Sequence, residues 1–212
     1  MKLYSVTKTT LVVPLLLALM LFSGLNQAEA IHPQQVIQNV TDELLSLLEQ
    51  KKQEGKAEID KPSFLTELET ILNPAVDYEK FSKGVMGKYY RKSTDLQHRQ
   101  FIDVFKKSLF AAYGNAFMAL DNEKITIQSY NKPLRTKATI KMDVHTSSGK
   151  VYPIAYSMHL TSDDEWKLKN VIVNGMNLGL TFKNQFLSLM SKYRDVDKVI
   201  LHWSSDIPNE PT

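Results

Sequence analysis

Residues 85–117 read VMGKYYRKSTDLQHRQFIDVFKKSLFAAYGNAF, and they predict the longest helix of the chain. Thr94 and Gln97 have the spacing of a capping box, in which each side chain bonds the backbone N–H of the other residue. Apolar residues then recur at helical spacing as far as about Ala119, so one face of the helix must pack against another element. That face consists of Phe101, Val104, Phe105, Ser108, Leu109, Ala112 and Ala116.

Residues 123–174 change to a hydrophobic period of two, which is typical of strands with one covered face. Short turns such as Ser147-Ser148-Gly149 and Asp163-Asp164 separate the alternating segments. The pattern predicts four strands in one antiparallel sheet, and helices must cover its apolar face. The alternating apolar residues are Ile125, Ile127, Ala138, Ile140, Met142, Val144, Tyr152, Ile154, Tyr156, Met158 and Leu160, followed by the strand 166–173.

Further helices are predicted before and after the sheet segment in the sequence. The evidence for them is helical periodicity, together with Pro62 at a helix start and Asn73-Pro74 at a helix end. The fold class is therefore α+β, a single domain over residues 31–203. Its helical part spans about 33–119, its sheet about 123–174 and its C-terminal helices about 179–203, with a flexible tail at 204–212. The additional helices are expected at about Pro33–Lys52, Pro62–Leu72, Ala75–Val85, Leu180–Tyr193 and Asp195–Trp203.

The N-terminus has the pattern of an export signal. Lys2 and Lys8 precede the apolar run Leu11–Phe22, and Ala28-Glu29-Ala30 has the small-x-small form of a cleavage site. The apolar run is too short for a hydrocarbon core of about 30 Å. We therefore expect residues 1–30 to be removed, which leaves an exported, soluble chain.

Composition excludes several classes of function. The chain has no cysteine, so disulfides, thiolate metal sites and cysteine nucleophiles are excluded. A net charge of +3 gives no reason to invoke nucleic acid, but it is compatible with transient contact with anionic lipid headgroups. The sequence has no phosphate loop, His-Glu-x-x-His, Gly-x-Ser-x-Gly or Gly-x-Gly-x-x-Gly motif, so we predict no cofactor, no metal and no catalytic residue.

Histidine and aspartate offer one alternative chemistry. Asp143 and His145 share a strand face and His159 lies on the next strand, so an acid–base site is conceivable. All three alternate with the apolar residues of their strands. A solvent-facing polar row is therefore the favoured interpretation.

Two stretches resemble one family. The first has the order Val85-x-Gly87-x-Tyr89-Tyr90-Arg91 before the long helix. The second, WKLKNVIVNGMNLGLTFKNQF at 166–186, has a Trp-x-Leu strand, a Gly turn and a helix that contains Phe186. Together they resemble the MlaC, or toluene-tolerance, family of periplasmic phospholipid carriers, over about residues 33–203.

The resemblance implies a nuclear-transport-factor-2-like cone, in which a curved sheet and helices enclose a cavity, with an additional helical subdomain. It also implies a monomeric shuttle without catalysis, which carries glycerophospholipid in the periplasm. The implied partners are an inner-membrane ABC transporter with a lipid-binding, MCE-type subunit and an outer-membrane lipoprotein–porin complex. The system would maintain the lipid asymmetry of the outer membrane.

The family's cavity implies a set of pocket residues that are apolar, aromatic or adaptable, as methionine is. Ordinary core packing is the alternative for each. Lys88, Arg91 and Lys92 are weak candidates for a headgroup site, with a solvated cationic cluster as the alternative. The pocket candidates are Val85, Met86, Tyr89, Tyr90, Phe105, Leu109, Tyr113, Phe117, Ile140, Met142, Ile154, Tyr156, Met158, Trp166, Met176, Phe182 and Phe186.

The chain departs from the family pattern at several positions. Asn170 and Asn174 stand where acids are usual, and Lys183 stands where the family has arginine. An internal Arg–acid pair would therefore be weakened or lost. Two rival functions stay open: a small cone-fold enzyme that uses Asp143, His145 and His159, and a periplasmic adaptor or chaperone for apolar polypeptide.

Overall fold

A computed structural model describes residues 31–54, 60–120, 123–133 and 135–203. The predicted signal peptide and the C-terminal tail lie outside the described residues. Among the described helices, none is both long and apolar enough to cross a bilayer. The helices are α2 (Pro33–Gln53), α3 (Lys61–Leu72), α4 (Tyr78–Met86), the 3-10 helix η2 (Gly87–Lys92), α5 (Asp95–Met118), α6 (Leu178–Tyr193) and α7 (Val196–His202).

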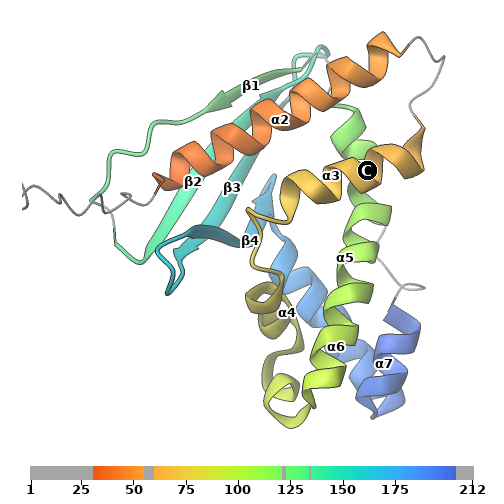
Figure 1. Cartoon of the computed structure of the whole chain (residues 1–212). Helices are drawn as coiled ribbons and strands as arrows, with labels where there is room; N and C mark the ends of the chain where they lie inside the picture. Colours follow the sequence, from red (N-terminus) through yellow and green to blue (C-terminus); the bar gives the residue numbers. More distant parts are fainter. Residues whose placement is uncertain (1–30, 55–59, 121–122, 134, 204–212) are drawn as a thin grey trace, which may run out of the picture.

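The predicted α+β class is confirmed, and the sheet has five strands in the order β1-β2-β3-β4-β5, all antiparallel (Figure 1). The fifth strand was not predicted. It forms because Asn174 and Gly175 both have positive φ, 47° and 82°, and close a two-residue hairpin. The strands are β1 (Lys124–Ile127), β2 (Lys137–His145), β3 (Val151–Leu160), β4 (Trp166–Val173) and β5 (Met176–Asn177).

The capping box predicted for the long helix α5 is confirmed. Thr94 Oγ1 accepts from Gln97 N at 3.2 Å, and Gln97 Oε1 accepts from Thr94 N at 3.0 Å. The helix predicted from Ala75 begins later, at Tyr78. Residues 75–77 instead extend along β4, because Leu168 N donates to Ala75 O and Asp77 N donates to Leu168 O, both at 2.8 Å.

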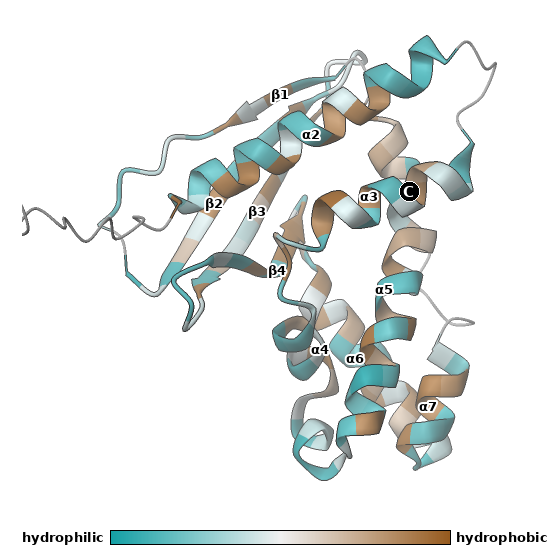
Figure 2. Cartoon of the chain, in the orientation of Figure 1, coloured by the Kyte–Doolittle hydropathy of each residue, from teal (hydrophilic) through white to brown (hydrophobic). Residues whose placement is uncertain are grey.

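Helix α2 lies across the apolar face of the sheet, whereas α4 to α7 form a bundle beyond β4 (Figure 1). Ile37 of α2 packs with Ala138, Ile140 and Met158. The long helix α5 has its main contacts with α3, α4 and α7. The expectation that helices cover the apolar face of the sheet is met by α2, whereas the long helix α5 belongs to the bundle. In Figure 2, hydrophobic and hydrophilic residues alternate along α2, as a helix with one covered face requires.

An aromatic cluster fixes the bundle. Phe101, Phe105, Phe182, Phe186 and Trp203 are each 0% exposed. Their rings meet mostly edge to face, for example Phe101 with Trp203 at 4.9 Å between centroids. The indole of Trp203 donates to Ser108 Oγ at 2.9 Å, so the buried N–H is satisfied. This cluster is a closed core.

A neutral amide network connects the sheet to the start of α6. Asn170 Oδ1 accepts from Gly179 N at 2.9 Å, and Asn170 Nδ2 donates to Asn177 Oδ1 at 3.0 Å. Asn177 Oδ1 also accepts from Leu180 N at 3.1 Å and so caps α6. Asn170 is thus used as both donor and acceptor, which an amide side chain allows and a carboxylate does not.

Gly179→Ala should destabilise the fold by about 1–3 kcal/mol, because the new Cβ would lie 2.5 Å from Asn170 Oδ1 and would displace the amide from its partners. Gly84→Ala is the matched control, since Gly84 lies inside α4 and a Cβ there meets nothing within 4 Å. That control should stabilise the chain by about 0.5–1 kcal/mol. Urea unfolding measures both, and equal destabilisation by the two variants would contradict the role of the network.

Candidate functional site

The apolar face of the sheet is built from two cross-strand rows. Met142, Ile154 and Val173 form one row, and Ile140, Tyr156 and Val171 form the next. Side chains directly opposite on antiparallel strands point to the same face, so each row is one continuous apolar band. The two bands run from beneath α2 toward the helical bundle.

The side chains of these two rows are more exposed on β3 and β4 than on β2. Ile140 and Met142 are 0% and 3% exposed, because α2 lies over them. Ile154, Tyr156, Val171 and Val173 are only half-buried, although β3 and β4 are interior strands of the sheet. Tyr156 packs against the cluster under α2, whereas Val171 packs against the bundle. The junction between the two hydrophobic clusters therefore lies between these cross-strand partners.

Tyr156 lies at this junction, on the β3 side. Its side chain keeps accessible surface, yet burial strongly raises the pKa of its hydroxyl. The hydroxyl has a weak partner, Met142 Sδ at 3.9 Å.

The structure divides the predicted pocket residues into two groups. The first is closed core, and these side chains offer no surface to a ligand as they stand. The second group keeps accessible surface, so lining a pocket stays a prediction for them. Closed are Val85, Met86, Phe105, Ile140, Met142, Met158, Trp166, Phe182 and Phe186; half-buried are Tyr89, Tyr90, Leu109, Tyr113, Phe117, Ile154, Tyr156 and Met176.

Val171 and Val173 were missed as pocket candidates, and the reason is a β-bulge. Continuing the alternation from Trp166 and Leu168 would point residues 170 and 172 inward. The register shifts between Ser157 and Met158, so that Met158 faces Leu168 whereas Tyr156 faces Val171. The extra residue reverses the phase and turns the two valines to the apolar face.

The three cationic candidates for a headgroup site lie away from the two apolar rows of the sheet. Lys88, Arg91 and Lys92 are exposed on η2, which joins α4 to α5 at the end of the bundle remote from the sheet (Figure 1). Beside them, Tyr90 stacks on His98 with 3.7 Å between ring centroids and donates to Glu79 Oε1 at 3.2 Å. The structure brings these cations together but not next to the two apolar rows.

The residues of the enzyme alternative do not converge. Asp143 and His145 pair with Pro153 and Val151 at one end of β3, whereas His159 pairs with Lys137 near the other end. The expectation that His159 faces solvent is wrong, because it is 5% exposed. Asp77 at the start of α4 covers it, with 2.8 Å between Oδ2 and Nε2. Among the described residues, no group of three or more His, Asp or Glu side chains could hold a metal.

Comparison with known proteins agrees with this architecture. A family model described as MlaC protein matches residues 38–205. The toluene tolerance protein ttg2D of Pseudomonas putida is 37% identical over 177 residues, which are 82% of this chain and 81% of that protein. A phospholipid-binding protein from Ralstonia solanacearum, solved in complex with a phospholipid, superposes with a TM-score of 0.70 at 20% identity, over 81% of this chain and 94% of that one. At 20% identity, the likeness to the Ralstonia solanacearum protein shows a shared fold.

The raised pKa of Tyr156 predicts a pH dependence of stability. An unfolded tyrosine ionises near pH ~10. The folded side chain stays protonated above that value, so its contribution to the free energy of unfolding is complete below pH ~10 and is lost as the pH rises further. Tyr156→Phe should flatten this loss in denaturant titrations across alkaline pH. Tyr152→Phe, which removes a more exposed hydroxyl from the same strand, is the control; identical slopes for Tyr156→Phe and the unchanged protein would contradict the assignment.

Proposed function

Because the chain belongs to the MlaC family, we propose that it binds a phospholipid and carries it through the aqueous periplasm after removal of residues 1–30. The observation that carries the proposal is the half-covered pair of apolar rows on the sheet, with Ile154, Tyr156, Val171 and Val173 at the junction of two hydrophobic clusters. Such a surface suits acyl chains, which need apolar contact and no strict pattern of polar partners.

The free energy of exposing acyl chains explains why a carrier is needed. Each methylene removed from water contributes about 0.8 kcal/mol, so two chains of ~15 carbons represent roughly 20–25 kcal/mol. A lipid does not cross an aqueous compartment alone against such a cost. A protein that offers comparable apolar area can carry it with no covalent step.

Entry of the chains requires the two clusters to separate where Tyr156 meets Val171. The bundle is braced by its own aromatic core. Helix α2 packs on the sheet through one hydrophobic cluster and on α3 and Phe110 of α5 through another. We propose that Ile154, Tyr156, Leu109, Tyr113, Phe117 and Met176 contact the chains, and that closed residues such as Phe182 support them from behind. Lys88, Arg91 and Lys92 would contact the phosphate only if the headgroup reaches η2.

The partners follow from the family. We propose exchange with an ABC transporter that has an MCE-type subunit at the inner membrane, and with a lipoprotein–porin complex at the outer membrane. This traffic would maintain lipid asymmetry of the outer membrane. Neither nucleotide nor metal enters the proposal, so the direction of transport would be set by the partners.

Native mass spectrometry of the protein purified from the periplasm without detergent tests the proposal directly. A co-purifying mass that extracts as diacyl phospholipid is the expected result. A bare mass that stays bare after incubation with liposomes would overturn it. A bound apolar peptide would favour the adaptor or chaperone alternative instead.

Val171→Trp should lower the amount of co-purifying phospholipid severalfold, because the larger side chain would occupy the junction between the clusters. Ile172→Trp is the matched control, since Ile172 is the next residue of the same strand and lies on the opposite face with Lys141 and Asp143. Lipid extraction and quantification per mole of folded protein measure the effect. Equal loads in the two variants would place the acyl chains elsewhere.

A further inference from the structure

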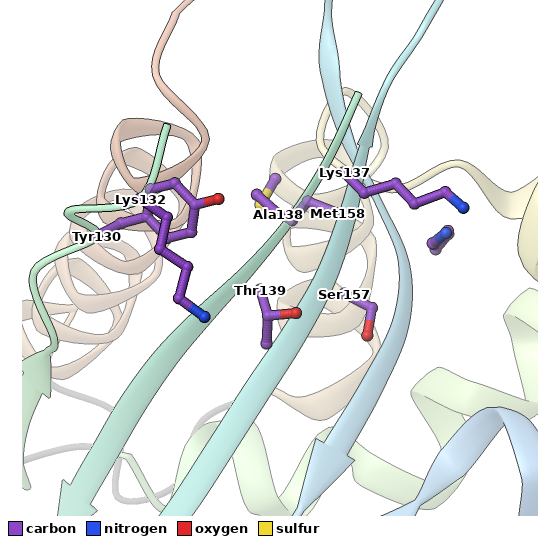
Figure 3. A pocket seen from close by; sticks show the side chains of 8 residues that line it. Tyr130, Lys132, Lys137, Ala138, Thr139, Ser157 and Met158 are labelled. Atoms are coloured by element: carbon purple, nitrogen blue, oxygen red, sulfur yellow. The ribbon is translucent and has the colours of Figure 1, made fainter. Parts of the chain in front are cut away.

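The outer face of the sheet, opposite the two apolar rows, carries a hollow of about 300 Å³ that the proposed function does not use (Figure 3). Its polar walls come from Lys132, Lys137, Lys169, Thr139 and Ser157, and Tyr130, Ala138 and Met158 complete it. A volume of this size corresponds to roughly ten water molecules, too little for two acyl chains of ~30 carbons in all. A small polar group would fit.

All the charged side chains that line the hollow are cations. Its lining contains three lysines and no carboxylate. Within the described residues, Lys132, Lys137 and Lys169 have no ion pair. The carboxylates of the same region have other partners: Asp77 bonds His159, Asp143 accepts from Gln128, and Glu165 pairs with Lys167.

Desolvation, followed by repulsion from Lys137 and Lys80, lowers the pKa of Lys169. The crowded cations are therefore not neutralised within the fold. An anion that entered the hollow would relieve this repulsion.

The hydroxyls of Thr139 and Ser157 complete the set of donors. These residues are direct cross-strand partners on β2 and β3, so their side chains lie side by side (Figure 3). Neither hydroxyl makes a hydrogen bond within the described part of the chain. Two free hydroxyls between ammonium groups form an arrangement that suits an oxyanion with several acceptor oxygens.

The fold holds this arrangement in place. The bulge that turns Val171 inward also makes Lys169 the extra residue of β4, opposite the bond between Ser157 and Met158. The wall at Tyr130 is anchored by its N–H, which donates to Gln34 Oε1 of α2 at 2.9 Å. Lys137 begins β2 and pairs with the buried His159. The hollow is therefore set by the backbone of regular elements on three sides.

We propose that this hollow is an anion site that binds a phosphate group through Lys132, Lys137, Lys169 and the hydroxyls of Thr139 and Ser157. The phosphate can come from free inorganic phosphate or from the headgroup of a lipid at a membrane surface. In either case the site is separate from the carried acyl chains, because it opens on the other face of the sheet.

Titration of the ¹⁵N-labelled protein with sodium phosphate, against sodium chloride at equal ionic strength, tests the site. Saturable shifts of the amides around Thr139 and Ser157 are expected with phosphate and not with chloride. Lys137→Gln with Lys169→Gln should weaken binding at least about tenfold, because two charge-assisted hydrogen bonds are lost. Lys107→Gln with Lys198→Gln, which removes the same charge from exposed helix positions, should leave the affinity unchanged.

Thr139→Val with Ser157→Ala keeps every charge and separates a built site from general attraction. This pair should also weaken phosphate binding, while the co-purifying phospholipid of all variants stays at the level of the unchanged protein. Shifts that never saturate, equal affinity in the site and control variants, or equal binding of acetate would overturn the proposal.

Vesicles identify the source of the phosphate. Flotation with phosphatidylcholine vesicles that contain phosphatidic acid, lost in the Lys137→Gln, Lys169→Gln variant and competed by inorganic phosphate, would support the site with a lipid headgroup as its ligand. Phosphate binding without flotation would support the site with free phosphate as its ligand.

Discussion

The β-bulge between β3 and β4 is the constraint on which both faces of the sheet depend. One extra residue in β4 changes which side chains point inward, so Leu168 and Val171 share a face although three positions separate them. Without it, the amide of Asn170 would point into the apolar interior and Val171 would point to solvent. The bulge also leaves Asn170 beside the start of α6, where it contacts Gly179 and Asn177. The position of the bundle relative to the sheet therefore follows from this local irregularity.

A second set of contacts holds the bundle from the other side. Residues 75–77 extend along β4 through the two backbone hydrogen bonds with Leu168. Asp77 then caps α4 by accepting from Lys80 N at 2.7 Å, and its other oxygen meets His159 of β3. One carboxylate thus fixes the start of a helix and its place on the sheet. Because α4 and α6 both pack against β4, the bundle side of the junction between Tyr156 and Val171 is fixed in position.

The sequence predicted the elements whose signals are local. The capping box at Thr94 and the alternation of 138–144 are both present as expected. Asn174-Gly175 is the strongest two-residue hairpin signal, and it could have predicted the fifth strand. The start of α4 was placed too early because the pairing of Val76 with Leu168 joins residues far apart in the chain. The burial of His159 also depends on a residue far away in the chain, Asp77, so the pattern of its own strand could not predict it.

The candidate site was predictable as a set of apolar residues but not as a surface. Periodicity identifies Phe105 and Leu109 as members of the same helix face, yet the first is closed core and the second keeps accessible area. Phe105 is closed because Phe81, Phe182 and Trp203 from other helices pack around it, and such contacts are a property of tertiary packing. The outer hollow was missed for a related reason, since Lys169 joins Lys137 only through the bulge.

The proposed carriage of lipid requires a fold that is stable on its own and still accepts an apolar guest, and the distribution of burial meets both needs. Five aromatic side chains with no exposed area brace the bundle, so its packing does not depend on a ligand. The residues at the junction of the clusters already have accessible surface. Separating Tyr156 from Val171 would therefore expose less additional apolar area than opening a closed core would, and the free-energy cost scales with that area. In the proposed function, acyl chains would cover the apolar area that this movement exposes and so offset its cost.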